Sequence, residues 1–130
     1  MHPDYAITFF YYPDLAAVVP FYEQTLRLEL VLDQGMARIY RVSGNSYFGI
    51  VDGQRGHLPH QPRSAVLLTL VVADVPAWHA RMTAAGVAGL TGILTGTYCE
   101  HFFFEDPHGY AIEIQRFRDP LVAQRFASAS

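Results

Sequence analysis

Three side chains near the end of the chain have types and spacing suited to chemistry: Cys99, His101 and Glu113. Residues two apart in an extended strand share a face, so Cys99 and His101 are expected on the same side of one strand. In the segment that carries Glu113, Ile112 and Ile114 share the opposite face. We therefore expect the two isoleucines to pack under helices and Glu113 to point the other way.

A carboxylate in that position can bind a cationic or hydrogen-bonding ligand or act as a general base. It can equally be a paired or hydrated structural group, and the sequence leaves both alternatives open. His101 lies near Glu113 only if the odd-numbered residues of 99–105 share its face, and strand alternation equally allows the even-numbered residues there. A histidine at the sheet margin and a buried, unreactive Cys99 are the simpler interpretations.

The remaining histidines offer weaker candidates. His57 and His60 have a spacing that would suit two metal ligands on one helical turn, but Pro59 and Pro62 make a helix improbable there. We interpret this segment as a solvated loop. His79 is expected on the exposed side of its helix.

The segments that must position these groups alternate between two patterns. Short runs of aromatic and β-branched residues predict strands, and 3.6-residue periodicity predicts helices. The predicted strands are 5–12, 28–32, 37–42, 47–51, 66–72, 90–94, 101–105 and 110–115, and the predicted helices are 15–27, 74–85 and a short one within 118–127. Pro20 removes a backbone donor inside the first helix, which predicts a bend or an irregular turn.

The two halves of the chain repeat one another. Asp14 and Asp74 each precede a predicted helix and lie 60 residues apart, as do Ile7 and Leu67 in the preceding strands. We infer two copies of a βαβββ unit in a single domain. The boundaries are 1–130 for the domain, about 5–52 for repeat one, 53–64 for the loop, about 65–117 for repeat two and 118–130 for the tail.

This organisation resembles the vicinal oxygen chelate superfamily, which includes glyoxalase I, bleomycin resistance proteins, extradiol dioxygenases and fosfomycin resistance proteins. Residues 13–30 (PDLAAVVPFYEQTLRLEL) are similar to the family's opening segment, residues 72–78 (VADVPAW) to its second opening, and residues 102–114 (FFFEDPHGYAIEI) to its closing segment. Arg27 stands where the family usually has glycine. The resemblance implies an α+β fold in which two tandem βαβββ repeats form curved mixed sheets around a cleft, with helices outside.

The resemblance also implies positions for a metal. Metal-dependent members hold one divalent ion with four side chains, and these positions fall on Ile7, a residue within 47–51, Leu67 and Glu113. Hard or borderline ions need carboxylate or imidazole donors, and only Glu113 supplies one. A metal in the family's usual geometry is therefore not expected, and no cofactor is predicted. A divalent metal held by borrowed ligands is the alternative.

The same resemblance outlines a cleft. If Ile7 and Leu67 face it, alternation places other residues of their strands beside them and creates an apolar, aromatic trough with one carboxylate. Such a lining suits planar or hydrophobic small molecules better than phosphates or sugars. The predicted ligand contacts are Ile7, Phe9, Tyr11, Leu67, Thr69, Phe103 and Glu113, and the candidate catalytic residues are Glu113 and His101.

These features lead to one expected function and two alternatives. We expect metal-independent binding of a small aromatic or hydrophobic molecule, in the manner that the resemblance to bleomycin resistance proteins implies. The first alternative is a lyase, isomerase or dioxygenase that uses a metal, or Glu113 or His101 as base. The second is a structural or regulatory dimer whose cleft is filled. Whether the protein is an enzyme stays open.

Composition excludes several other classes. The chain has 9 Lys+Arg and 12 Asp+Glu, a formal net charge of −3, and no basic cluster, which argues against nucleic acid or an anionic membrane as partner. Its longest apolar run, residues 65–73, is about half of the roughly 20 residues that a membrane-spanning helix needs. Without a basic signal region we expect a cytoplasmic location. The family resemblance and the 51% hydrophobic content predict a homodimer.

Overall fold

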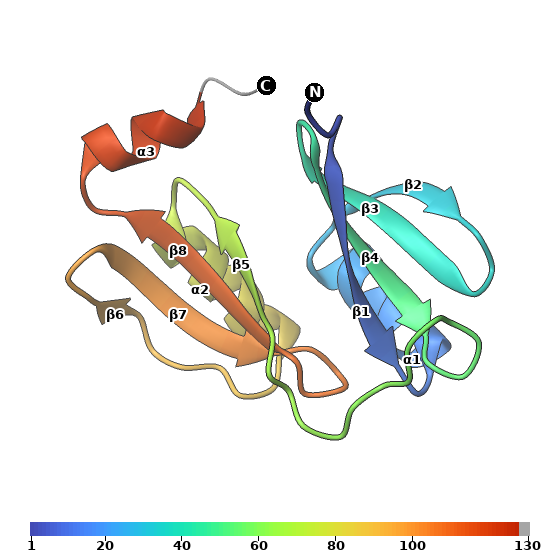
Figure 1. The fold of residues 1–130 in the computed structure, drawn as a ribbon. Helices are drawn as coiled ribbons and strands as arrows, with labels where there is room; N and C mark the ends of the chain where they lie inside the picture. Colours follow the sequence, from blue (N-terminus) through green and yellow to red (C-terminus); the bar gives the residue numbers. More distant parts are fainter. Residues whose placement is uncertain (128–130) are drawn as a thin grey trace. The chain divides into compact units, whose positions relative to one another are not determined.

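The computed structural model describes residues 1–127, which form two compact units, Met1–Pro62 (unit 1) and a second that begins at Arg63 (unit 2). Each unit contains one four-stranded mixed sheet and its own helices (Figure 1). The predicted α+β class with tandem βαβββ repeats is thereby confirmed. None of the helices among the described residues is long and apolar enough to cross a membrane.

Unit 1 follows the predicted order of elements. These are β1 (Ala6–Tyr12), α1 (Leu15–Pro20), the π-helix η1 (Phe21–Thr25), β2 (Glu29–Asp33), β3 (Ala37–Ser43) and β4 (Ser46–Asp52). The sheet order is β1-β4-β3-β2, with β1 parallel to β4 and the other pairs antiparallel. Phe10 and Tyr12 are buried on one face of β1, so Ile7, Phe9 and Tyr11 point to the opposite face.

The predicted helix over residues 15–27 changes character at Pro20. Proline has no backbone N–H, and the turn that follows it widens into the π-helix, in which the Leu26 amide donates to the Phe21 carbonyl at 2.9 Å. This turn places Tyr22 fully inside the core, where its hydroxyl and that of Tyr12 are 2.8 Å apart. The irregularity that Pro20 predicts therefore has a packing consequence.

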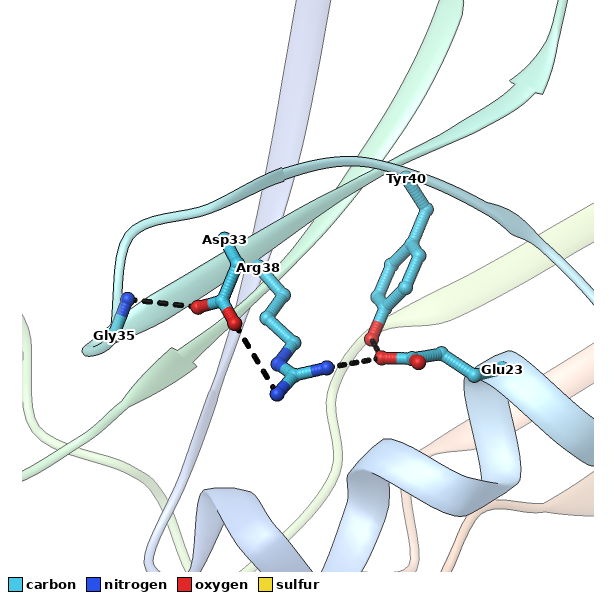
Figure 2. Close-up of polar contacts among 5 residues, drawn as sticks. All are labelled: Glu23, Asp33, Gly35, Arg38 and Tyr40. Carbon is cyan, nitrogen blue, oxygen red and sulfur yellow. Dashed lines mark hydrogen bonds and ion pairs between the residues drawn. The ribbon is translucent and has the colours of Figure 1, made fainter.

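A polar network ties the π-helix to the sheet of unit 1. The Arg38 guanidinium donates to Glu23 at 2.6 Å and pairs with Asp33 at 3.3 Å, while the Tyr40 hydroxyl donates to the same Glu23 oxygen at 2.9 Å (Figure 2). Burial, together with the bond to Glu23, raises the pKa of Tyr40, and the bond to Glu23 raises the pKa of Arg38. Each group is matched by a partner, so we interpret the network as structural.

Unit 2 repeats the pattern. Its elements are β5 (Leu67–Val71), α2 (Val75–Ala85), β6 (Leu94–Thr95), β7 (Cys99–Glu105), β8 (Ala111–Phe117) and α3 (Pro120–Ala127), and the sheet order is β5-β8-β7-β6 with β5 parallel to β8. The Asp74 carboxylate caps α2 by accepting from the Ala77 amide at 3.0 Å, and Gly86 ends the helix with a φ of 67°. Asp14, its counterpart in unit 1, makes no such side-chain bond.

The core of unit 2 lies between its sheet and α2, which runs across the sheet in Figure 1. Phe102 and Phe104 of β7 and Ile112 and Ile114 of β8 are almost completely buried, and Met82 of α2 is fully buried. The expectation that the isoleucines are buried is therefore confirmed. Alternation leaves the odd-numbered residues of β7 and β8 on the other face, which we call the open face of unit 2.

Two local predictions were wrong. The strand expected over residues 90–94 is reduced to Leu94–Thr95. Gly89 takes a φ of 65°, and the segment before Leu94 contacts β7 only at isolated points, such as the hydrogen bond from the Thr91 amide to the Phe103 carbonyl.

His79 is not on an exposed side of α2. Its ring packs edge-on against Phe102 at 4.9 Å, and Nε2 lies 2.8 Å from the Thr91 carbonyl oxygen.

Arg27 carries backbone strain that can be tested. Its φ is 58°, the left-handed region in which a Cβ costs about 1–2 kcal/mol and glycine is favoured. Glycine removes this strain but loses more backbone entropy on folding, which offsets part of the gain. We therefore expect Arg27→Gly to raise the free energy of unfolding by about 0.5–1 kcal/mol in urea titrations. Arg27→Ala keeps the Cβ and should give no gain. Equal stabilisation by both substitutions would contradict the strain.

The Glu23 network makes a second prediction. Glu23→Gln removes the charge that Arg38 and Tyr40 share, so the free energy of unfolding should fall by about 1 kcal/mol. Glu29→Gln is the matched control, because the ion pair of Glu29 with Arg41 is more exposed and should contribute less than about 0.5 kcal/mol. A larger loss in the control than in Glu23→Gln would refute the structural role.

Candidate functional site

The open face of unit 2 brings several of the predicted residues together around Glu113. Thr69 of β5 and Phe103 of β7 lie directly opposite Glu113 in the two neighbouring ladders. The Thr69 hydroxyl donates to Oε1 of Glu113 at 2.8 Å, which orients the carboxylate on this face. Leu67 lies two residues before Thr69 and is about half exposed, so it extends the same face.

His101 also lies on this face, because β7 adopts the odd-numbered alternation. Its Nδ1 is 3.1 Å from Sγ of Cys99, and one ligand atom from each of Cys99, His101 and Glu113 lies within 4.8 Å of the others. The ring is held between Phe103, whose centroid is 5.3 Å away, and Gly96, where an added Cβ would come within 3.2 Å of the imidazole. The sheet therefore gathers a thiol, an imidazole and a carboxylate.

Cys99 is not prepared to act as a nucleophile in this form. Burial, and secondarily the negative charge of Glu113, raises the pKa of the Cys99 thiol above its ordinary value. Because the thiolate is the reactive species, a raised pKa makes Cys99 a weaker nucleophile than an ordinary thiol. Cys99 is only partly buried, and its lack of reactivity stays a prediction.

An apolar cavity of about 330 Å³ lies at one end of unit 2, where β5 and β8 end and α3 begins. Val71, Phe117 and Phe126 are among the side chains that line it, and the rings of Phe117 and Phe126 stack with centroids 5.4 Å apart. Phe117 is paired directly with Cys99 in the ladder, so it belongs to the same face. Phe117 lies beyond the strand predicted over residues 110–115, and continued alternation past residue 115 was the available signal for it.

The predicted residues of repeat one, Ile7, Phe9 and Tyr11, lie on one face of the sheet of unit 1. Phe9 pairs with Gly49 of β4 and its ring occupies the space in which a side chain at Gly49 would stand. A Cβ added there would be 2.3 Å from two ring carbons of Phe9. The ring and the glycine are therefore complementary.

Gly49 is the counterpart of Glu113 in the other unit. Phe9 and Thr69 are equivalent at the offset of 60 residues, and their partners on the adjacent inner strands are Gly49 and Glu113. This pairing resolves the register of residues 47–51 that the sequence left open. The two repeats share a fold but differ at this position, a glycine under an aromatic ring in one and an oriented carboxylate in the other.

A second cavity, about 360 Å³, is found in unit 1, and its lining includes Arg38 and Arg55. Arg38 is paired with Glu23 and Asp33, and Arg55 is paired with Asp52 at 3.1 Å. The two cations are thus already neutralised by neighbouring carboxylates. Residues 53–66, which include His57 and His60, contain neither helix nor strand, in keeping with the predicted loop.

Comparisons with known proteins agree with this architecture. Residues 5–114 match the family described as Glyoxalase/Bleomycin resistance protein/Dioxygenase superfamily, and the chain belongs to that family. A search of curated protein sequences finds no match.

Solved structures with the same fold include three from bacteria. Lactoylglutathione lyase from Agrobacterium tumefaciens is 21% identical, with a TM-score of 0.72 over 88% of this chain and 95% of that one. A glyoxalase/bleomycin resistance protein/dioxygenase from Nocardioides is 15% identical, with a TM-score of 0.73 over 90% and 85%. A glyoxalase/bleomycin resistance protein from Streptomyces sp. CB03234 is 24% identical, with a TM-score of 0.68 over 85% and 98%.

The residues at the family's metal positions do not fit a divalent ion. Ile7 and Leu67 have no donor atom, and Gly49, the counterpart of Glu113, has no side chain at all. The ring of Phe9, which has no donor atom, occupies the space in which a side chain at Gly49 would stand. A single carboxylate does not hold such an ion against water.

The complementarity of Phe9 and Gly49 predicts a measurable coupling. Gly49→Ala should lower the free energy of unfolding by about 1–2 kcal/mol, because its Cβ forces the Phe9 ring to move. In a Phe9→Ala background the same change should cost much less, which a double-mutant cycle in urea would reveal. Gly92→Ala is the matched control, since a Cβ there meets no atom within 4 Å. Additive losses at Phe9 and Gly49 would contradict the packing.

Proposed function

We propose that the open face of unit 2 binds a small aromatic or hydrophobic molecule, and that this binding does not require a metal. The observation that carries the proposal is the oriented Glu113 carboxylate beside the apolar side chains of Leu67, Val71 and Phe103, on a face that continues toward a cavity of about 330 Å³. Ligand sites are commonly apolar hollows of this size with a few convergent polar groups. The fold relatives named bleomycin resistance proteins support a binding role as an analogy.

The apolar part of the site would supply most of the affinity. Phe103 lies beside Glu113 and is partly accessible, and Leu67 and Val71 on β5 are exposed by 49% and 59%. Large exposed apolar side chains on one sheet face lose unfavourable contact with water when a ring covers them. A planar molecule therefore gains both burial and stacking with Phe103.

The polar part would select the molecule. Thr69 donates to one oxygen of Glu113, so the carboxylate presents a directed acceptor to the face. A ligand with an N–H group or a positive charge matches that acceptor, whereas an anion is repelled. On the face of unit 1, Ile7, Phe9 and Tyr11 are the counterparts of Leu67, Thr69 and Val71, and their contact with a ligand stays a prediction from the sequence.

The test uses N-phenyl-1-naphthylamine, an uncharged aromatic amine whose fluorescence rises on burial, with protein kept in EDTA. We expect saturable binding of about one probe per chain, and a loss of about tenfold in affinity for Phe103→Ala, which corresponds to about 1.4 kcal/mol. Glu113→Gln should weaken the amine but not naphthalene, which has no donor. Leu58→Ala, in the exposed interrepeat loop, is the control and should change neither affinity.

Two results would overturn this proposal. Absence of saturable binding in EDTA would remove the ligand site. Conversion of the bound molecule, detected by mass spectrometry after incubation and abolished by Glu113→Gln, would replace a binding role with the enzymatic alternative. Recovery of the probe unchanged is the expected outcome.

A further inference from the structure

We propose that Cys99, His101 and Glu113 form a site for a borderline transition-metal ion such as Zn²⁺, built within unit 2, which shares Glu113 with the family's four ligand positions but takes its other two ligands from β7. One ligand atom of each residue already lies within 4.8 Å of the others. This proposal goes beyond the proposed function, because ion binding needs no organic ligand and the organic ligand is bound in the presence of EDTA.

The geometry needs only small adjustments. Bonds to zinc of about 2.3 Å for sulfur and 2.0–2.2 Å for nitrogen or oxygen place tetrahedral ligand atoms about 3.5 Å apart. Sγ of Cys99 and Nδ1 of His101 are 3.1 Å apart in a hydrogen bond, so an ion that replaces the shared proton must spread them slightly. All three side chains are only partly buried, which leaves them room to rotate about their own torsions.

The donor types select the metal. A thiolate and an imidazole favour zinc and its borderline relatives over Mg²⁺ and Ca²⁺, which prefer oxygen. Thiolate and carboxylate together balance the charge of a divalent ion, which is required for binding at a partly dehydrated site. Three protein ligands leave a fourth position for water or another oxygen, as in zinc sites that are open to small molecules.

Neighbouring groups support the ligands. Thr69 holds Oε1 of Glu113 at 2.8 Å and thereby directs the carboxylate. The His101 ring is confined by Phe103 and by the close backbone of Gly96, where a side chain would come within 3.2 Å of the ring. Oriented ligands lose less side-chain entropy when an ion binds.

The experiment uses the full chain without a histidine tag, stripped of metal with EDTA and then desalted. Titration with Zn²⁺ in competition with a chromophoric chelator should give one ion per chain. Co²⁺ should give a sulfur-to-cobalt charge-transfer band in the near ultraviolet, which reports thiolate ligation directly. Because Cys99 is the single cysteine of the sequence, intact-mass measurement of alkylation reports this thiol alone, and Zn²⁺ should slow the reaction at least tenfold.

Variants locate the ion. Cys99→Ala, His101→Ala and Glu113→Gln should each weaken Zn²⁺ binding by more than about 100-fold, and Thr69→Val by about 10- to 100-fold. Glu100→Gln, on the same strand but the other face, and His57→Ala, in the exposed loop, are matched controls that should bind normally. Urea titrations without metal establish that each variant is folded.

Several outcomes would overturn the site. These are a Co²⁺ complex without the charge-transfer band, alkylation of wild-type Cys99 that Zn²⁺ does not slow, or equal weakening by the control variants. The wild-type alkylation measurement decides the matter even if a ligand variant fails to fold. Loss of aromatic probe binding in EDTA would leave this ion site untouched, so the two proposals fail separately.

Discussion

The strict alternation of side chains across a paired strand governs what unit 2 can do. Phe102, Phe104, Ile112 and Ile114 are driven to one face by burial against α2, and a slip of one residue would expose all of them. Because burial of these four side chains determines the strand register, Glu113 and the other odd-numbered residues must lie on the opposite face. The chemistry of the open face is therefore a consequence of how the core packs.

The two repeats share a fold but carry different residues at equivalent positions of their inner strands. In unit 1 the position equivalent to Glu113 is Gly49, and the Phe9 ring takes up the released space. In unit 2 the carboxylate remains and Thr69 orients it. Three of the four metal positions that the family resemblance implies have no donor side chain here, and Glu113 offers a carboxylate beside apolar neighbours, which is why binding of a small apolar molecule is the function we propose.

Cys99 and His101 add two side chains that can bind a metal ion to the open face of unit 2. Both are contributed by β7, whereas the family positions mapped from the sequence lie on β1, β4, β5 and β8. An ion on Cys99, His101 and Glu113 would therefore share Glu113 with the positions that the family resemblance implies and use two other ligands from the adjacent strand β7. The raised pKa of Cys99 describes the ion-free form, in which burial favours the neutral thiol.

Much of the fold could be predicted from the spacing of residue types along the sequence. Alternating strands, the offset of 60 residues and the aspartates at the starts of the first two predicted helices, Asp14 and Asp74, predicted the order of elements correctly. The errors arose where long-range packing overrides local preference: residues 90–94 lie beside β7 without forming a regular ladder, and His79 is drawn against Phe102. Neither arrangement has a signal in the neighbouring sequence.

The amino-acid sequence by itself determined the tandem architecture and the apolar nature of Ile7 and Leu67, because periodicity and residue type are local properties. It did not determine which face of β7 carries its odd-numbered residues, or which residue of β4 stands opposite Phe9. Those depend on strand register, and register is settled only when the two apolar faces meet their helices and hydrogen bonds form between distant segments. The proximity of Cys99, His101 and Glu113 is therefore a result of the tertiary structure.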